Sequence, residues 1–172
     1  MELMQGIDHH HSDPRSVRCG IITVSDTRTV ETDASGKAIR ELLHDHNHTV
    51  AHYEIVTDDA FALQKRVRDL CEAQTVQALI LTGGTGIAPR DSTIEAIEPL
   101  LDKKLDGFGE LFRMLSYQQV GASAMLSRAN AGVCAKTVVF ALPGSTPAVK
   151  LATESLILPQ IAHIAGLLSP CP

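Results

Sequence analysis

Short apolar runs alternate with longer segments of helical periodicity along most of the chain. Runs rich in valine, isoleucine and leucine, bounded by turn residues, occur at residues 17–25, 50–57, 76–82 and 137–142. Such runs are typical of strands buried on both faces, as in a parallel sheet. Helical patterns lie between and after them, at residues 35–46, 60–74, 92–130 (as two or three pieces) and 145–168. This order predicts an α/β fold: a single three-layer domain with a doubly wound, mostly parallel sheet and helices on both faces.

The last helical segment carries its own start and break signals. Ser145 is placed to act as N-cap, and Pro147 falls in the first turn, where its missing N–H costs nothing. Pro159 is expected to break or kink the helix before residues 160–168.

The chain length of 172 residues suits one well-buried core. We expect one folded domain at residues 17–168, with a flexible N-terminal tail at residues 1–16 and a C-terminal tail at residues 169–172. The run His9–His11 could bind a metal, but its glycine-, serine- and proline-containing surroundings favour a solvated tail.

Composition and charge exclude several kinds of partner. The net charge is −5, the basic residues are scattered and aromatic residues make up 3% of the chain, so we expect no binding to nucleic acid. The four cysteines form no C-x-x-C pair, which indicates reduced thiols rather than a zinc site or a disulfide framework. No apolar run reaches the roughly 18 residues of a membrane span, and the N-terminus lacks a secretory signal. We therefore expect a cytoplasmic protein with no membrane association and a small-molecule ligand.

Polar residues collect directly after the four predicted strands. The clusters are Ser25-Asp26-Thr27-Arg28, Asp58-Asp59, Gly83-Gly84-Thr85-Gly86 and Pro143-Gly144-Ser145-Thr146. In open α/β sheets ligands bind outside the carboxyl ends of the strands, and exposed backbone N–H groups there favour an anion. The sequence thus predicts an anion site at this edge of the sheet.

The glycine-rich cluster is weak evidence when taken alone. Pro89 occupies the place of the third glycine of a dinucleotide fingerprint, and no Walker A lysine follows. A tight strand-to-helix turn that needs positive φ explains the glycines equally well.

Two acidic positions beside this loop point to a bound metal. Ser92 and Glu95 fit a capping box, so Asp91 is not needed as a helix cap. A carboxylate next to a phosphate site indicates that a metal ion lies between them. Asp58 could supply a second carboxylate, although Asp58 and Asp59 could instead cap the helix that follows them.

Apolar residues recur at helical spacing in the segment LDGFGELFRMLS. They are Leu105, Phe108, Leu111, Phe112 and Leu115. This pattern is typical of a helix that faces the core, and the alternative is an apolar face shared between subunits.

Five motifs in this order and spacing resemble the MoaB/Mog family of molybdopterin-binding proteins in molybdenum cofactor biosynthesis. The motifs are GIITVSDTRT, LILTGGTGIAPRDSTIEA, GFGELFRMLS, AMLSRANAG and VVFALPGSTPAVK. The likeness covers residues 17–168, and TVSDTRT with GFGELFR is more similar to the MoaB branch. Thr57 stands where Mog-type sequences tend to have proline before the first acidic residue.

The resemblance implies a molybdopterin adenylyltransferase, a nucleotidyltransferase that uses ATP and Mg²⁺. Asp58 and Asp91 match the acidic positions that the family uses, and we assign them as catalytic residues and Mg²⁺ ligands. Ser127 matches a position linked to the pterin. The residues expected to bind substrate are Ser25, Asp26, Gly83, Gly84, Thr85, Gly86, Arg90, Ser127, Pro143, Gly144 and Ser145.

Two other functions stay open at this point. The chain could bind or carry molybdopterin without catalysis, or act as an oligomeric partner of other molybdenum cofactor synthesis proteins. The resemblance also implies a homo-oligomer, either a trimer or a hexamer.

Overall fold

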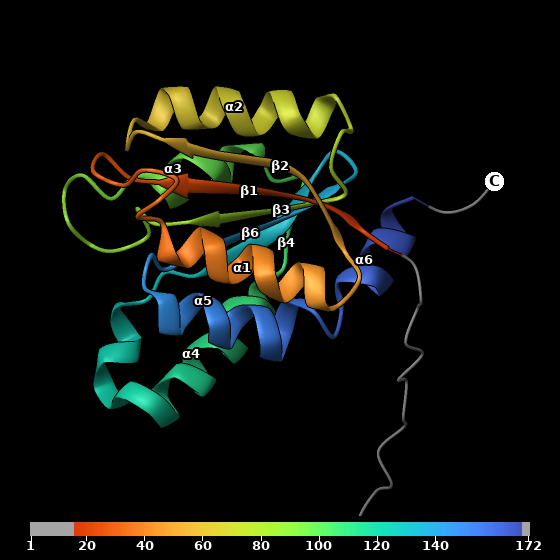
Figure 1. The fold of residues 1–172 in the computed structure, drawn as a ribbon. Coiled ribbons are helices and arrows are strands. Elements are labelled where there is room, and N and C mark those ends of the chain that lie inside the picture. The colour runs from red at the N-terminus through yellow and green to blue at the C-terminus, as the bar shows by residue number, and fades with distance from the viewer. Residues whose placement is uncertain (1–15, 170–172) are drawn as a thin grey trace, which may run out of the picture.

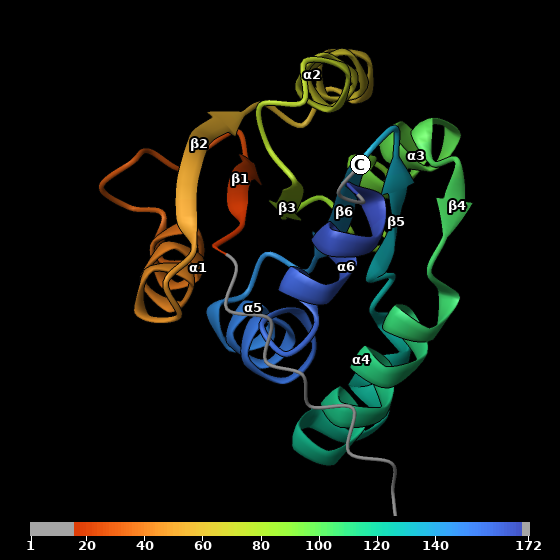
Figure 2. The same ribbon diagram turned by 90° about the vertical axis from the view of Figure 1, so that its right-hand side faces the viewer.

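A twisted six-stranded sheet lies between two layers of helices in the computed structural model, which describes residues 16–169 (Figures 1 and 2). The strands are β1 (Arg18–Val24), β2 (Thr49–Val56), β3 (Ala78–Thr82), β4 (Lys103–Lys104), β5 (Asn130–Cys134) and β6 (Thr137–Leu142). The helices are α1 (Ala34–Asp45), α2 (Ala60–Glu72), α3 (Thr93–Ile97), α4 (Asp106–Val120), α5 (Thr146–Ala152) and α6 (Ile161–Leu168). Three short helical segments, η1 (Glu98–Leu100), η2 (Gly121–Leu126) and the π-helix η3 (Thr153–Ile157), connect them.

The sheet has the order β2-β1-β3-β6-β5-β4. The first four strands in this order are parallel, whereas β5 is antiparallel to β6 and β4 is antiparallel to β5. In Figure 1 the arrowheads of β1, β2 and β3 point the same way. The predicted α/β fold with a mostly parallel sheet is therefore confirmed.

Two strands, β4 and β5, were not predicted from the sequence. β4 is a pair of exposed lysines, and β5 reads NAGVC, so neither shows an apolar run. Their pairing depends instead on a distant contact. A Cβ atom at Gly132 would lie 2.5 Å from the carbonyl oxygen of Lys103, so only glycine allows the two strands to approach this closely.

The predicted helix boundaries agree with the structure to within two residues for α1 and α2. α1 begins after Asp33, whose carboxylate accepts the N–H of Gly36 and caps the helix. Ser145 occupies the N-cap position of α5, as predicted, but its hydroxyl makes no capping hydrogen bond. The predicted break at Pro159 is confirmed, because the helix from Thr146 to Ile157 and the helix α6 are bent by 61°.

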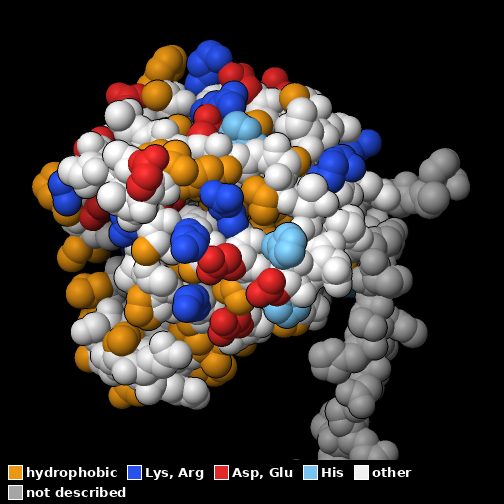
Figure 3. Space-filling model, in the orientation of Figure 1, with side chains coloured by type: hydrophobic (Ala, Val, Ile, Leu, Met, Phe, Trp, Pro, Cys, Tyr) orange, Lys and Arg blue, Asp and Glu red, His pale blue; other side chains and the backbone are white. Residues whose placement is uncertain are grey.

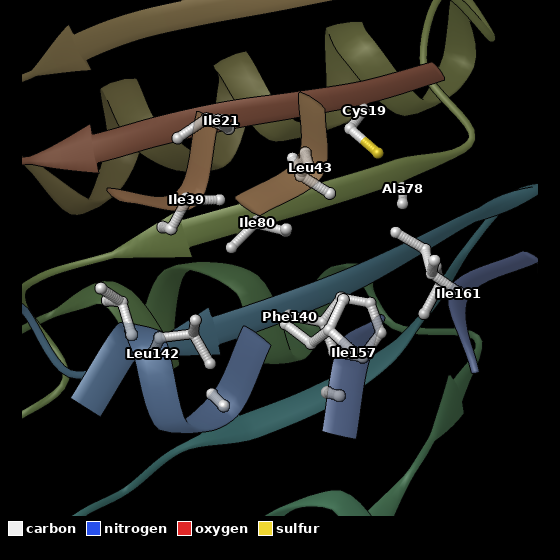
Figure 4. Packing of buried hydrophobic residues seen from close by; sticks show 14 of the residues in the cluster. Cys19, Ile21, Ile39, Leu43, Ala78, Ile80, Phe140, Leu142, Ile157 and Ile161 are labelled. Carbon is white, nitrogen blue, oxygen red and sulfur yellow. The ribbon is translucent and has the colours of Figure 1, made fainter. Parts of the chain in front are cut away.

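Side chains alternate between the two faces of the sheet and fill a separate core on each. Ile21 and Ile80 point to the layer that contains α1, α4, α5 and α6, whereas Ile22 and Leu81 point to the layer that contains α2 and α3. Figure 4 shows the first of these cores, with strand residues packed against α1 and the C-terminal helices. Each fully buried side chain of this size stabilises the fold by about 1.5–3 kcal/mol.

The phenylalanines of α4 belong to the core. Phe112 is 1% exposed and Phe108 is 8% exposed. The ring of Phe108 packs against Phe140 of β6 at 5.2 Å between centroids. Leu111 lies on the other side of the helix and is 48% exposed. The prediction of a core-facing helix is therefore confirmed, and the face that carries Leu111 stays a candidate for contact between subunits.

Some expectations lie outside the described residues or are only partly addressed. The predicted tails, including His9–His11, fall outside residues 16–169 except for Ser16 and Ser169. Among the described residues, no single helix has the length and apolar character to cross a membrane, and the bent pair Thr146–Ile157 with Ile161–Leu168 meets that test only jointly. Cys19, Cys71 and Cys134 are buried free thiols.

Candidate functional site

The four polar clusters that follow the parallel strands do meet at one edge of the sheet. The N–H of Ser25 donates to the carbonyl oxygen of Val56 at 2.8 Å, which joins the ends of β1 and β2. The N–H of Gly83 donates to the carbonyl oxygen of Leu142 at 3.0 Å, which joins the ends of β3 and β6. Parallel topology thus brings together segments that are far apart in the chain, as the sequence analysis predicted.

A pocket of about 440 Å³ opens at this edge, a volume within the usual range for small-molecule sites. One wall is the glycine-rich loop after β3, and the opposite wall is formed by α4, η2 and α5. Nine predicted site residues line it: Gly83, Gly84, Thr85, Gly86, Asp91, Ser127, Pro143, Gly144 and Ser145.

The wall opposite the glycine loop is mainly apolar. It contains Phe112 and Val120 of α4, Leu126 of η2 and Leu151 of α5. The hydroxyl groups of Ser116 and Ser123 and the amide of Gln119 add polar groups along the same wall. A flat ring with polar edges and an attached anion would match this combination of surfaces.

The first two glycines of the loop are required by the backbone. Gly83 has a φ of +102° and Gly84 a φ of +62°, which side-chain-bearing residues rarely adopt. A Cβ atom would lie 2.3 Å from the Val24 carbonyl oxygen at Gly83, and 2.3 Å from Thr93 Oγ1 at Gly84. The tight-turn interpretation is therefore correct for both, and it does not exclude a ligand.

The loop also offers backbone donors to a ligand. Two hydrogen bonds from Thr93 fix the base of the loop. The Thr93 hydroxyl donates to the Gly83 carbonyl oxygen at 2.9 Å, and the Thr93 N–H donates to the Gly84 carbonyl oxygen at 2.9 Å. Within residues 16–169, the N–H groups of Gly84, Thr85 and Gly86 have no hydrogen-bond acceptor in the protein. Unpaired N–H groups in a pocket wall are suited to an anion.

Asp91 lies in the pocket wall and closes the loop on itself. Its Oδ2 atom accepts the N–H of Ala88 at 2.8 Å. A Cβ atom at Gly86 would lie 2.6 Å from the same oxygen, so the third glycine leaves room for this carboxylate. Asp91 Oδ1 accepts no hydrogen bond among the described residues and is available to a ligand.

The predicted capping box is wrong, although Ser92 does occupy the N-cap position of α3. Its hydroxyl makes no capping bond and donates instead to Asp58 Oδ1 at 3.2 Å. Glu95 forms an ion pair with Arg128 rather than reaching back to the helix start. The reason is that both side chains find tertiary partners, which a local motif cannot show.

The structure assigns different tasks to the neighbouring acids Asp58 and Asp59. Asp59 caps α2, because its Oδ1 accepts the N–H of Ala62 at 2.7 Å. Asp58 makes no such bond, and its N–H donates to Asp26 Oδ1 at 3.0 Å. Asp58 is therefore joined to Asp26 on one side and to Ser92, next to Asp91, on the other.

The donor set fits Mg²⁺ only if a ligand completes it. No group of three or more His, Cys, Asp or Glu side chains within residues 16–169 could hold a metal ion alone. Mg²⁺ is commonly bound by one or two carboxylates together with substrate phosphates and water. Asp58 and Asp91, each with one carboxylate oxygen free of hydrogen bonds, fit that pattern.

Four predicted residues, Ser25, Asp26, Asp58 and Arg90, do not line the 440 Å³ pocket. Ser25 lines a smaller adjoining cavity of about 250 Å³ together with Arg28, Gly83 and Gly144. Arg90 is exposed at the tip of the loop and forms no ion pair among the described residues.

A buried network around Asp33 was missed by the sequence analysis. Asp33 accepts hydrogen bonds from Thr23 Oγ1 at 2.5 Å, Tyr53 Oη at 2.8 Å and Arg28 Nη1 at 3.1 Å. Arg28 also donates to the carbonyl oxygen of Gly144 at 3.2 Å. Burial raises the pKa of Asp33, but these hydrogen bonds and that from Gly36 outweigh it and hold the pKa below 3.8. The network fixes the loop after β6 against the loop after β1.

Arg128 is a second residue that the sequence analysis missed, although it adjoins the predicted Ser127. Its Nε donates to the carbonyl oxygen of Thr85 at 3.1 Å, and its Nη2 donates to that of Asp91 at 3.2 Å. Its guanidinium also pairs with both carboxylate oxygens of Glu95 and lowers the pKa of Glu95. An arginine beside a pocket serine gave no signal of these contacts in the sequence.

Comparisons with known proteins point to one family. Residues 20–163 match the family described as "Probable molybdopterin binding domain". The chain is 54% identical over 158 residues to molybdenum cofactor biosynthesis protein B of Bacillus subtilis, covering 91% of this chain and 93% of that protein. A crystal structure of a molybdenum cofactor biosynthesis protein B is 52% identical, with a TM-score of 0.87 over 90% of this chain and 97% of that one. The tungsten cofactor synthesizing protein MoaB from Pyrococcus furiosus is 40% identical, with a TM-score of 0.78 over 88% of this chain and 96% of that one.

Proposed function

Because the chain belongs to the MoaB/Mog family of molybdenum cofactor biosynthesis proteins, with a molybdopterin-binding domain, we propose that the 440 Å³ pocket binds molybdopterin and that the protein adenylylates it. The observation that carries the proposal is the arrangement of the pocket. Unpaired N–H groups of the glycine loop and the Asp91 carboxylate lie on one wall, and an apolar wall with serine hydroxyl groups faces them.

Each part of molybdopterin has a matching surface. The phosphate accepts hydrogen bonds from the N–H groups of Gly84, Thr85 and Gly86. The pterin ring lies against the apolar wall, where Phe112 and Leu126 exclude water from its faces. Ser127, which lies in the same wall, is placed to hydrogen-bond the polar edge of the ring.

Adenylyl transfer joins the molybdopterin phosphate to the α-phosphate of ATP. A phosphate oxygen of molybdopterin forms a bond to the α-phosphorus, the bond to the β-phosphate oxygen breaks, and pyrophosphate leaves. The attacking phosphate is already ionised near neutral pH, so no protein base or nucleophile is required. The protein contributes positioning and charge neutralisation, which are the main requirements of such reactions.

Asp58 and Asp91 would hold Mg²⁺ through their free carboxylate oxygens. When bound, the ion neutralises phosphate charge that would otherwise repel both the carboxylates and the second substrate. Asp58 is kept in place by Ser92 and by Asp26, and Asp91 by Ala88. The hydrogen bonds therefore orient both acids before any ligand arrives.

A second function, molybdopterin binding without catalysis, is favoured by two observations. Asp58 does not line the pocket, and residues 16–169 offer no group of three potential metal-ligating side chains. A carrier would need the glycine loop and the apolar wall but neither carboxylate.

Titration of the protein with molybdopterin, followed by measurement of pyrophosphate release with Mg²⁺ and ATP, separates the two functions. Adenylylation predicts release that depends on both substrates. Tight molybdopterin binding without release would establish the carrier function, and absence of molybdopterin binding would contradict both.

We also propose that the exposed face of α4 and η2 packs against another copy of the chain, giving the trimer or hexamer that the resemblance implies. This face carries Leu111, Met114 and Tyr117 of α4, which are 48–65% exposed, and Met125 of η2 at 79%. Figure 3 shows hydrophobic side chains gathered over this part of the molecule. An apolar surface of this kind on an otherwise charged protein is typical of an interface. The same surface would serve if the partner were another molybdenum cofactor synthesis protein.

A further inference from the structure

The seven residues from Thr85 to Asp91 form a loop whose two ends are tied by a single side chain. Arg128 donates from Nε to the Thr85 carbonyl oxygen at 3.1 Å and from Nη2 to the Asp91 carbonyl oxygen at 3.2 Å. Ile87, Ala88, Pro89 and Arg90 between these ends are exposed. The loop is thus closed at its base by a guanidinium that comes from a distant part of the chain.

Other contacts hold the start of the loop but not its far end. Gly83 and Gly84 are fixed by β6 and by Thr93, independently of Arg128. Apart from Arg128, the partner of Asp91 among residues 16–169 is Ala88, which belongs to the same loop. The position of the Asp91 backbone relative to the glycines therefore depends on Arg128 and on the start of α3.

Arg128 also connects the loop to the opposite wall of the pocket. It follows Ser127, which lines the pocket, and precedes β5. Its remaining N–H groups pair with Glu95 on α3, so one guanidinium contacts both ends of the loop and α3. Arginine is suited to this task because its planar fork of donors reaches several acceptors in fixed directions.

We propose that Arg128 is a positioning residue for adenylyl transfer: it fixes the Asp91 carboxylate at a set place relative to the glycine loop and to Ser127. This inference rests on the proposed function of the pocket. In this proposal Arg128 does not contact the substrate. Loss of the Arg128 guanidinium would leave the phosphate-binding glycines in place and would let Asp91 move.

The ion pair of Arg128 with Glu95 should contribute little to stability, because the Arg128 side chain is 32% exposed and that of Glu95 is 56% exposed. Arg128→Lys keeps the positive charge and the aliphatic stem but cannot reach both carbonyl oxygens. Folding should therefore survive the substitution while the loop loses its closure.

Two measurements test the proposal, and the first requires no turnover. Amide hydrogen exchange in residues 86–91 should be about 10-fold faster in Arg128→Lys than in the wild type, with exchange in β3 unchanged, because local opening becomes easier. The second is steady-state pyrophosphate release. For Arg128→Lys, kcat should fall by about 10-fold, with KM for molybdopterin within about threefold, since the glycines remain fixed.

Arg113→Lys is the matched control. Arg113 and Arg128 both line a cavity of about 590 Å³, but among residues 16–169 Arg113 donates only to the Ala129 carbonyl oxygen, at 3.4 Å. Arg113→Lys should change neither the amide exchange of residues 86–91 nor the steady-state release of pyrophosphate. Glu95→Gln should have a smaller effect than Arg128→Lys, because it removes a carboxylate charge but keeps the two carbonyl contacts.

The outcomes separate this inference from the proposed function. Exchange in residues 86–91 that is the same in Arg128→Lys and wild type would overturn the inference, whatever the turnover. Faster exchange with an unchanged kcat would also overturn it, because Asp91 would then need no positioning. A wild type that binds molybdopterin without releasing pyrophosphate would overturn the proposed adenylylation and, with it, the role of Arg128 in that reaction.

Discussion

Replacement of Asp33 by asparagine should lower stability more than any other single loss of charge in the described chain. The Asp33 side chain is fully buried and accepts four hydrogen bonds, from Thr23, Gly36, Tyr53 and Arg28. Asparagine keeps one acceptor oxygen, but its NH₂ group would face donors in place of the second oxygen.

The expected cost follows from these contacts. A hydrogen bond to a charged group contributes about 1.5–3 kcal/mol, and a helix cap about 1 kcal/mol, part of which asparagine retains. We therefore expect a loss of about 2–4 kcal/mol in the free energy of unfolding. For a protein of this size that corresponds to a fall in Tm of roughly 5–15 °C.

The effect should depend on pH with a defined sign. The pKa of Asp33 is lowered from 3.8 in the folded protein, so its ionised form stabilises the fold at pH values above 3.8. That contribution is lost as the pH falls through the lower, folded pKa. The difference between wild type and Asp33→Asn should be full at pH 7 and should shrink below about pH 4.

Thermal melting and urea unfolding between pH 3 and pH 7 measure both quantities. Asp45→Asn is the control, because the Asp45 side chain is 71% exposed at the end of α1 and its partner within residues 16–169 is His44. Its Tm should stay within about 1 °C of wild type. A change below about 2 °C for Asp33→Asn at pH 7, or a difference that persists undiminished at pH 3, would refute this account of the network.

Two further predictions concern the glycine loop and the exposed helix face. Gly84→Ala should destabilise the protein by about 1–3 kcal/mol and weaken molybdopterin binding, because φ is +62° and Thr93 Oγ1 lies 2.3 Å from the new Cβ. Gly107→Ala is the control, because a Cβ atom at Gly107 would have no neighbour within 4 Å; it should stabilise the protein by no more than about 1 kcal/mol. Equal urea midpoints for Gly84→Ala and Gly107→Ala would contradict the argument. Met114→Asp should reduce the oligomer to monomers in light scattering without a loss of helix content, because Met114 is 54% exposed on α4, whereas Phe112→Lys should unfold the protein. A wild-type protein that is monomeric at micromolar concentration would contradict the proposed interface.

The sequence predicted the parts of the fold that depend on local pattern. β1, β3 and β6 are apolar runs because both of their faces are buried, and this is visible in Ile21, Ile22, Ile80 and Leu81 alike. β4 and β5 have no such signal. They pair because Gly132 permits close approach to Lys103, and a contact of this kind depends on the folded arrangement.

The candidate site shows the same division between local and distant causes. The glycine loop and Asp91 were predictable because topology places the ends of parallel strands at one edge. The predicted capping box at Ser92 is wrong because Asp58, which lies after the end of β2, accepts the hydrogen bond of the Ser92 hydroxyl. The networks of Asp33 and Arg128 join residues from different segments of the chain, and neither has a spacing that a sequence pattern could reveal.

The measurement that tests the central claim most directly is pyrophosphate release by Asp91→Asn with molybdopterin, ATP and Mg²⁺. Asparagine keeps an oxygen to accept the Ala88 N–H, so the loop should keep its shape while one charge toward the metal is lost. Asp59→Asn is the control, because Asp59 caps α2 and makes no contact with the pocket. We expect adenylylation by Asp91→Asn to fall by roughly 10²-fold with little change in molybdopterin affinity, and Asp59→Asn to remain active. Unchanged turnover in Asp91→Asn would contradict the assignment of this carboxylate to the reaction.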